Sequence, residues 1–183
     1  MAIAMQHQTI IDFWFADINP SLWWEKDAGF DELIRQRFAI VYAQAVRGEL
    51  FSWRTTAEGR LAEIIVLDQF SRNMFRDSAQ AFAYDALALV LAQEAVANDA
   101  DKIIPIAWRS FMYMPFMHSE SLLIHEKAVE LFDQQGMEYN LDFELKHKVI
   151  IEKFGRYPHR NAILNRQSTP QEVEFLQQPN SSF

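Results

Sequence analysis

The residues best suited to chemistry lie in the segment 154–161, which reads FGRYPHRN. Arg156, His159, Arg160 and Asn161 follow directly after an apolar helical face and supply many hydrogen-bond donors. A turn that only joined two helices would not need so many. Because the planar fork of arginine suits bidentate recognition of carboxylate or phosphate, we predict that this segment faces an anion, a carboxylate or a buried polar network.

A second polar cluster lies earlier, in the segment 67–76. Asp68 and Arg72 are spaced i and i+4 on a helix that is apolar on two sides, so they can pair in a low dielectric. The segment also carries Gln69, Asn73 and Arg76. We predict that the two segments form two walls of one site. The alternative is a structural salt bridge, although a buried ion pair is weak evidence for stability by itself.

Three histidines are candidates for proton transfer, because imidazole titrates near neutral pH. His118 precedes Ser119 and Glu120, which suit an N-cap and a first helical turn, but capping gives no reason for His118 itself. His147 lies on an apolar stripe that leads into the arginine-rich turn, and His159 lies within that turn. Asp68 is a fourth candidate, either as a base or to orient an arginine.

The remaining histidine and carboxylate patterns favour a structural interpretation. His125 lies on an apolar face with no polar motif after it, so it is expected in the core. Glu144 and His147 form one Glu-x-x-His pair. A di-iron bundle needs two such pairs and two further glutamates, and no second pair is present. The sequence therefore predicts no metal and no cofactor.

Composition limits the class of protein. The chain has 183 residues, 50% of them hydrophobic, no cysteine and a net charge of -8. This predicts one folded domain over residues 1–183. The acidic balance disfavours nucleic-acid binding. Residues 1–10 lack the pattern of a signal peptide, and no apolar run reaches the length of a membrane span. We therefore expect a soluble cytoplasmic protein with no membrane partner, while its oligomeric state stays open.

Helical periodicity dominates the chain. It predicts helices over about 30–45, 56–76, 79–100, 120–134 and 140–154, another that begins near Pro105 and kinks or ends at Pro115, and a short last helix after residue 169. Capping boxes are predicted at Thr55 and Thr169, and a C-terminal stop at Gly155. No segment alternates with period two, so we predict an all-α fold. Antiparallel helix pairs stacked as a tetratricopeptide-like superhelix are expected, and a closed bundle is the alternative.

These motifs together resemble a bacterial family known as domain of unknown function 924, over residues 10–177. The resemblance rests on the motifs DFWF at 12–15, LDQFSRNMFR at 67–76, MP with HSE at 114–120, His147, FGRYPHRN at 154–161 and STP at 168–170. It implies an all-helical, tetratricopeptide-like fold and no assigned activity. His125 stands where the family is expected to have Gln, and Asn165 where Gly is expected.

The residues support three hypotheses. In the first, a polar pocket binds a small anionic metabolite, with Arg72, Arg156 and Arg160 holding the anion; whether a reaction follows is left open. The twelve residues predicted to line it are Asp68, Gln69, Arg72, Asn73, Arg76, His118, Glu120, His147, Arg156, His159, Arg160 and Asn161. In the second, a helical scaffold holds a peptide or protein partner in a concave groove. In the third, the polar motifs only clamp helices together.

Overall fold

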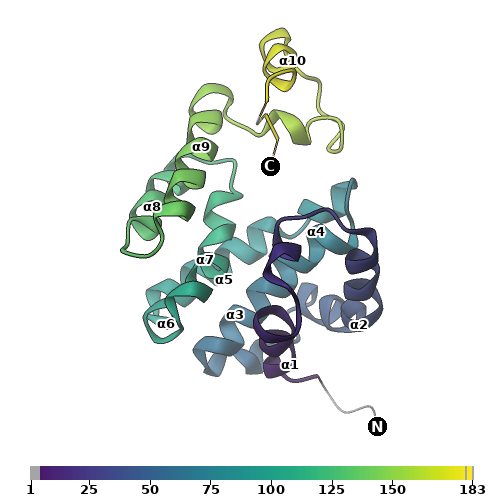
Figure 1. Ribbon diagram of the computed structural model, residues 1–183, viewed down its shortest axis with the longest axis vertical. Helices are drawn as coiled ribbons and strands as arrows, with labels where there is room; N and C mark the ends of the chain where they lie inside the picture. The colour runs from purple at the N-terminus through teal and green to yellow at the C-terminus, as the bar shows by residue number, and fades with distance from the viewer. Residues whose placement is uncertain (1–4, 180, 183) are drawn as a thin grey trace.

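The computed structural model describes residues 5–179 and 181–182, and within them every regular element is a helix (Figure 1). The α-helices are α1 (His7–Asp12), α2 (Ala28–Val46), α3 (Ala57–Ile65), α4 (Ser71–Met74), α5 (Asp85–Ala97), α6 (Ala100–Ile103), α7 (Ile106–Met117), α8 (Leu122–Phe132), α9 (Glu138–Phe154) and α10 (Pro170–Leu176). The predicted all-α class is therefore confirmed. The predicted superhelical stacking is compatible with this arrangement and stays a prediction. The predicted domain 1–183 includes residues 1–4, 180 and 183, which lie outside the described part.

Tighter and wider helical turns join these helices. They are the 3₁₀ turns η2 (Pro20–Trp23), η3 (Phe51–Thr55), η5 (Ala79–Phe82) and η6 (Pro158–Arg160), and the π turns η1 (Phe13–Asp17) and η4 (Val66–Phe70). The predicted helix 56–76 is thus one continuous run of α3, η4 and α4, with a π turn in its middle. The π turn matters for the site, because all five of its residues are buried.

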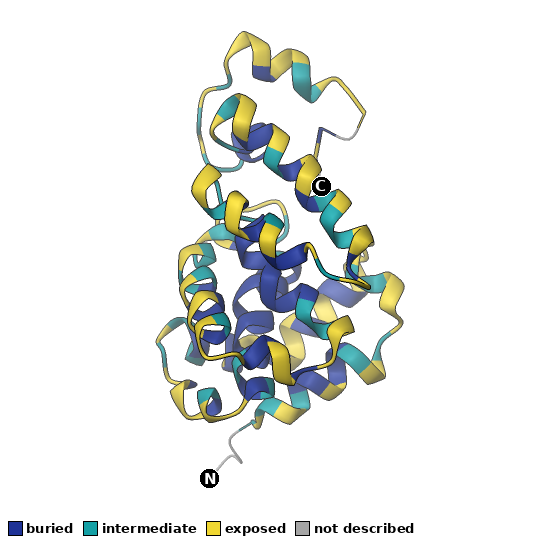
Figure 2. Cartoon of the chain, turned by 90° about the vertical axis from the view of Figure 1, so that its left-hand side faces the viewer, coloured by how far each residue is buried: buried dark blue, intermediate teal, exposed yellow. Residues whose placement is uncertain are grey.

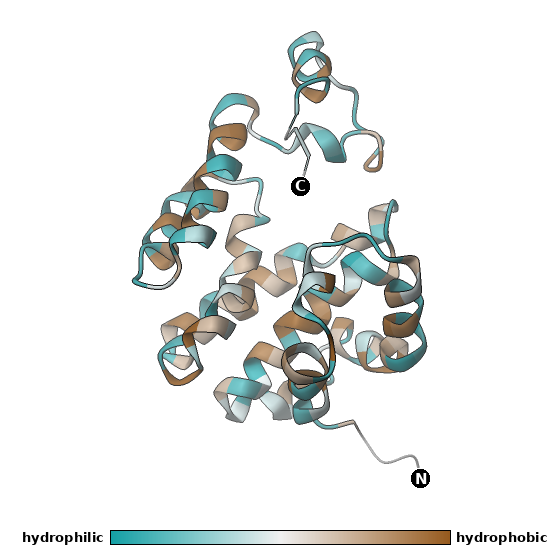
Figure 3. Cartoon of the chain, viewed as in Figure 1, coloured by the Kyte–Doolittle hydropathy of each residue, from teal (hydrophilic) through white to brown (hydrophobic). Residues whose placement is uncertain are grey.

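One large apolar core fills the middle of the molecule (Figure 2). Helices α2, α3 and α7 all contribute to it. Leu61, Ile64 and Ile65 of α3 and Phe111 and Met112 of α7 are almost completely buried. Helix α5 packs on both, as expected for an alanine-rich segment whose small side chains let neighbours approach closely. The outer helices are amphipathic, with hydrophilic residues on their outer sides (Figure 3).

The C-terminal arm, residues 156–182, has a small apolar cluster of its own. Tyr157 packs there with Ile150 and Ile151 of α9, and Phe154 stacks near Phe175 of α10. Gly155 ends α9 in the left-handed conformation with φ +68°, as predicted. Thr169 and Glu172 form the predicted capping box, with proline at the first helical position of α10.

Three sequence predictions about helix ends were wrong. Thr56 caps α3 in place of Thr55 and accepts from the Gly59 backbone N–H. Helix α8 begins at Leu122, so Ser119 is not its N-cap. The predicted helix 79–100 is divided, because α5 ends near Asp99, which has φ +56°. Helix α7 contains Pro115 and ends at Met117, two residues beyond it, and the predicted kink there stays a prediction. Within the described residues, no helix is long and apolar enough to cross a membrane.

Candidate functional site

Asp68 is the buried centre of the polar site. Its side chain is fully buried in η4. It accepts a hydrogen bond from Gln69 Nε2 at 2.6 Å and lies 2.8 Å from His118 Nδ1 and 3.3 Å from Arg72 Nη1. Burial alone would raise the pKa of Asp68, but the charge of Arg72 and the contacts with His118 and Gln69 outweigh it, so the pKa is lowered. Asp68 is therefore an ionised acceptor.

His118 completes a histidine–carboxylate pair with Asp68. It lies at the C-terminus of α7, directly after the turn that contains Pro115. Because the ionised Asp68 can only accept, Nδ1 of His118 carries the proton. In the neutral ring, Nε2 is then the unprotonated nitrogen. Burial and the charge of Arg72 lower the pKa of His118 in spite of Asp68, so the ring is neutral at pH 7 and able to accept a proton.

Arg72 is held by two carboxylates. Its guanidinium forms a bidentate pair with Asp85 at 2.9 and 3.0 Å and also contacts Asp68. Asp85 begins α5 and was not predicted as a site residue. In the sequence, Asp85 is a carboxylate at the start of an alanine-rich helix, where an acidic residue is also expected because it suits a first helical turn. Its pairing with Arg72 depends on the contact between α4 and α5 in the folded protein.

Arg160 is buried but poorly satisfied. Its residue exposure is 6%, and Nε has no hydrogen-bond partner among the described residues. Among the described residues its one ion pair is with Asp85, at 3.6 Å. The guanidinium also lies close to the rings of Phe82 and Tyr157, 4.7 and 4.5 Å from their centroids. Burial, followed by the charge of Arg72, lowers its pKa. A buried guanidinium without hydrogen bonds lowers the stability of the unliganded protein, because the lost contacts with water are not replaced.

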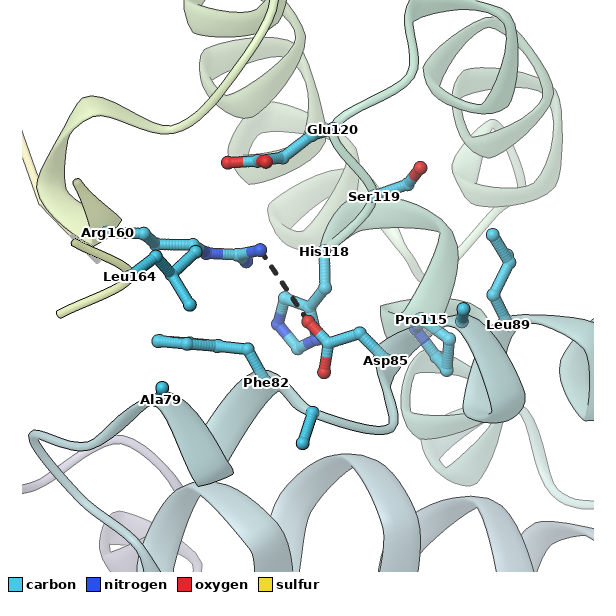
Figure 4. A pocket seen from close by; sticks show the side chains of 12 residues that line it. Ala79, Phe82, Asp85, Leu89, Pro115, His118, Ser119, Glu120, Arg160 and Leu164 are labelled. Atoms are coloured by element: carbon cyan, nitrogen blue, oxygen red, sulfur yellow. Dashed lines mark ion pairs between the residues drawn. The ribbon is translucent and has the colours of Figure 1, made fainter. Parts of the chain in front are cut away.

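Three of these residues, Asp85, His118 and Arg160, line a cavity of about 350 Å³ (Figure 4). Arg160 reaches across it from the C-terminal arm toward Asp85, and His118 lies on the side of α7 (Figure 4). The lining residues are Ala79, Phe82, Ala83, Asp85, Ala86, Leu89, Pro115, His118, Ser119, Glu120, Arg160 and Leu164. Pockets of this size hold small metabolites. Arg72 of the segment 67–76 and Arg160 of the segment 154–161 both pair with Asp85, while a shared site of the two segments stays a prediction.

Glu120 ties the C-terminal arm to the rest of the protein. Both of its oxygens are bound by Arg166, at 2.6 and 2.9 Å, and one also accepts from the Tyr157 backbone N–H. Arg166 in turn binds Asn161 at 3.0 Å. Asn165 adopts a left-handed conformation with φ +54°. This explains why glycine is expected at that position, and asparagine is among the residues that tolerate it best.

Several predicted site residues lie away from the cavity. Arg156 forms a bidentate pair with Glu172 of α10, at 2.7 and 2.8 Å. Asn73 and Arg76 both bind Asp31 of α2. These arginines hold elements together. Gln69 supports Asp68 from behind, and Asn161 supports Arg166.

Two further histidines are buried near Tyr157. His147 donates from Nδ1 to the Phe143 carbonyl at 2.7 Å, and burial is the main cause that lowers its pKa to about 3. His159 has a pKa lowered to about 4, first by burial and then by Arg160. Its Nδ1 has no partner among the described residues. Neither histidine lines the cavity, so His118 is the proton-transfer candidate that does.

His125 lies in the core, as predicted, but in a polar network that the sequence did not indicate. It is 2.6 Å from Glu144 of α9 and 2.8 Å from the Ser119 carbonyl. The hydroxyl of Tyr157 lies 3.2 Å from the same ring and donates to the Met117 carbonyl. This network links α7, α8, α9 and the arm. Within the described residues, no three His, Cys, Asp or Glu side chains form a group that could hold a metal.

Comparison with known proteins places the chain in a family. Residues 10–180 match the family described as bacterial protein of unknown function (DUF924). The chain belongs to this family. It is also similar to a solved structure of a protein of unknown function from Agrobacterium tumefaciens, with 39% identity and a TM-score of 0.89 over 93% of this chain and 96% of that one. A search of curated proteins gave no match.

Proposed function

We propose that the cavity binds a small anionic metabolite through Arg160, with His118 beside it as the proton-transfer group. The observation that carries the proposal is the state of Arg160. Its guanidinium is buried, lines the cavity, and has no hydrogen bond within the described part of the chain. Buried polar groups in folded proteins almost always have hydrogen-bond partners. An anion in the cavity would supply the hydrogen-bond acceptor that Arg160 lacks.

The surroundings of His118 support the second part of the proposal. Asp68 fixes the ring and its tautomer, which is the way a carboxylate prepares a histidine for proton transfer. Asp68 would also stabilise the imidazolium formed when Nε2 takes a proton from a bound ligand or water. Because the pKa of His118 is lowered, the ring would be in its accepting form at neutral pH.

Thermal unfolding with a panel of small anions tests the proposal. An anion at about 100 times its dissociation constant should raise the free energy of unfolding by about 2.7 kcal/mol. For a domain of this size this corresponds to a shift of several degrees. The shift should disappear in Arg160→Met. It should persist in Arg156→Met, a matched control whose arginine is bound to Glu172 outside the cavity. No shift with any anion, or an equal shift in Arg160→Met, would contradict the proposal.

A further inference from the structure

The cations near the cavity differ in whether a carboxylate already neutralises them. Arg72 is bound by both oxygens of Asp85, and Arg166 by both oxygens of Glu120. Within the part of the chain that the structure describes, Arg160 is the guanidinium that lines the cavity, and its one ion pair there, with Asp85, is long at 3.6 Å. The site therefore offers a ligand one positive charge.

Two carboxylates also line the cavity. Asp85 lies opposite Arg160, whose guanidinium reaches toward it, and Glu120 lies at another side of the cavity (Figure 4). A second negative charge on the ligand, as on a phosphate monoester or a polyphosphate, would find no second arginine or lysine among the described lining residues. Arg72 and Arg166 are already bound to these two carboxylates. A single negative charge on the ligand fits this arrangement better than two.

Apart from His118 and Ser119, the rest of the wall is apolar. Its apolar side chains are those of Ala79, Phe82, Ala83, Ala86, Leu89, Pro115 and Leu164. Leu89 and Pro115 lie across the cavity from Arg160 (Figure 4). A ligand held at Arg160 would therefore extend along methyl and ring carbons that gain by being covered.

The two aromatic rings on Arg160 restrict how an anion can approach it. The rings of Phe82 and Tyr157 lie close to the guanidinium, with their centroids 4.7 and 4.5 Å from its central carbon. The N–H groups lie along the edge of the guanidinium, so a ligand oxygen that accepts hydrogen bonds must approach that edge. Two parallel N–H donors on that edge match the planar, two-oxygen geometry of a carboxylate.

We propose that the ligand is a small monocarboxylate with an apolar body, whose carboxylate lies on the edge of Arg160 and whose hydrocarbon part lies toward Leu89 and Pro115. This rests on the proposed anion site and adds the chemical class of its ligand. Small side chains at Ala79 of η5 and Ala86 of α5 are consistent with such a ligand, because larger side chains there would fill the cavity.

The test is an NMR titration of the full chain with acetate, propionate, butyrate and pentanoate, and with inorganic phosphate and sulfate. The dissociation constant should fall roughly fourfold for each added methylene until the cavity is filled, and phosphate should bind more weakly than butyrate. Leu89→Ala should weaken pentanoate several-fold and leave acetate within twofold. Arg160→Met should weaken all carboxylates at least tenfold.

The outcomes separate this inference from the anion site on which it rests. If phosphate or sulfate binds through Arg160 as tightly as pentanoate, or if chain length has no effect, the monocarboxylate is wrong and the anion site stands. If none of the six anions binds, or binding is the same in Arg160→Met, both proposals are wrong.

Discussion

Replacing Arg160 with methionine should leave the unliganded protein as stable as before, or make it more stable. Most substitutions of a buried residue destabilise. Arg160 differs, because its charge is buried without hydrogen bonds among the described residues. Methionine has a similar length and can pack between Phe82 and Tyr157. The substitution also leaves no stranded partner, since both oxygens of Asp85 remain bound to Arg72.

The magnitude follows from two opposing terms. An unsatisfied buried donor costs about 1–3 kcal/mol, and more when charged. Against this, two cation–π contacts are lost, each worth about 0.5–1 kcal/mol and partly replaced by contacts of the methionine sulfur with the rings. We therefore expect the free energy of unfolding of Arg160→Met to rise by about 0–2 kcal/mol.

Urea unfolding of the wild type and two variants measures this directly. Arg72→Met is the matched control, because the same change there leaves Asp68 and Asp85 without their main counter-charge. Breaking a buried pair in this way costs about 3–5 kcal/mol. The two substitutions are chemically identical, and both arginines pair with Asp85, so the contrast in stability between the variants reports on how each arginine is satisfied.

One result would refute the reasoning. If Arg160→Met lost more than about 2 kcal/mol, as a structural arginine would, then Arg160 would stabilise the unliganded fold. The argument that it awaits a ligand would then fail. An unchanged or increased stability, together with the loss of anion binding, is what a residue retained for function predicts.

Three further predictions concern other parts of the site. The first concerns His118→Asn, which keeps a hydrogen-bond donor for Asp68. Calorimetry in buffers of different ionisation enthalpy should show that the wild type takes up protons near pH 6 when butyrate binds and that the variant does not. Equal proton uptake in both would exclude His118 as the proton-transfer group. Arg156→Ala should lower the melting temperature, because the C-terminal arm loses the ion pair between Arg156 and Glu172. Its affinity for butyrate should stay within twofold of the wild type. A large loss of butyrate affinity would show that Arg156 belongs to the site. Burial lowers the pKa of His147 to about 3 and of His159 to about 4, below the unfolded value of about 6.5, so the folded state binds fewer protons. The contribution of the two histidines to the free energy of unfolding is complete above pH 6.5. It should fall by roughly 1.4 kcal/mol per pH unit for each histidine as the pH drops toward 5. Urea unfolding measured from pH 7 to 5 with no such decrease would contradict the burial of these side chains.

Helices and their polar motifs were predictable, because they depend on local patterns. The period of the apolar residues gave α2 and α9 within two residues. Gly155 and Thr169 marked helix ends through backbone conformation and capping, which involve only neighbours in the chain. The π turn at Asp68 was not predictable, since tertiary packing decides where a helix widens.

The structure brings some of the predicted site residues together and separates others. Asp68, Arg72, His118 and Arg160 do gather at one place, and all four are polar residues at positions that the sequence assigns to buried faces. Arg156 carries the same chemistry but pairs with Glu172 on α10. A guanidinium binds whichever carboxylate the fold brings near it, and the sequence does not say which one that is.

The sequence by itself determined the helices, their amphipathic faces and the supply of arginine, histidine and carboxylate groups, because these depend on residue type and short-range spacing. Only the tertiary structure decided which charges cancel. It paired Arg72 with Asp85 and Arg166 with Glu120, and it placed Arg160 close to two aromatic rings at the edge of a cavity. These pairings join residues 13 and 46 positions apart, and they exist only because helix packing closes those distances.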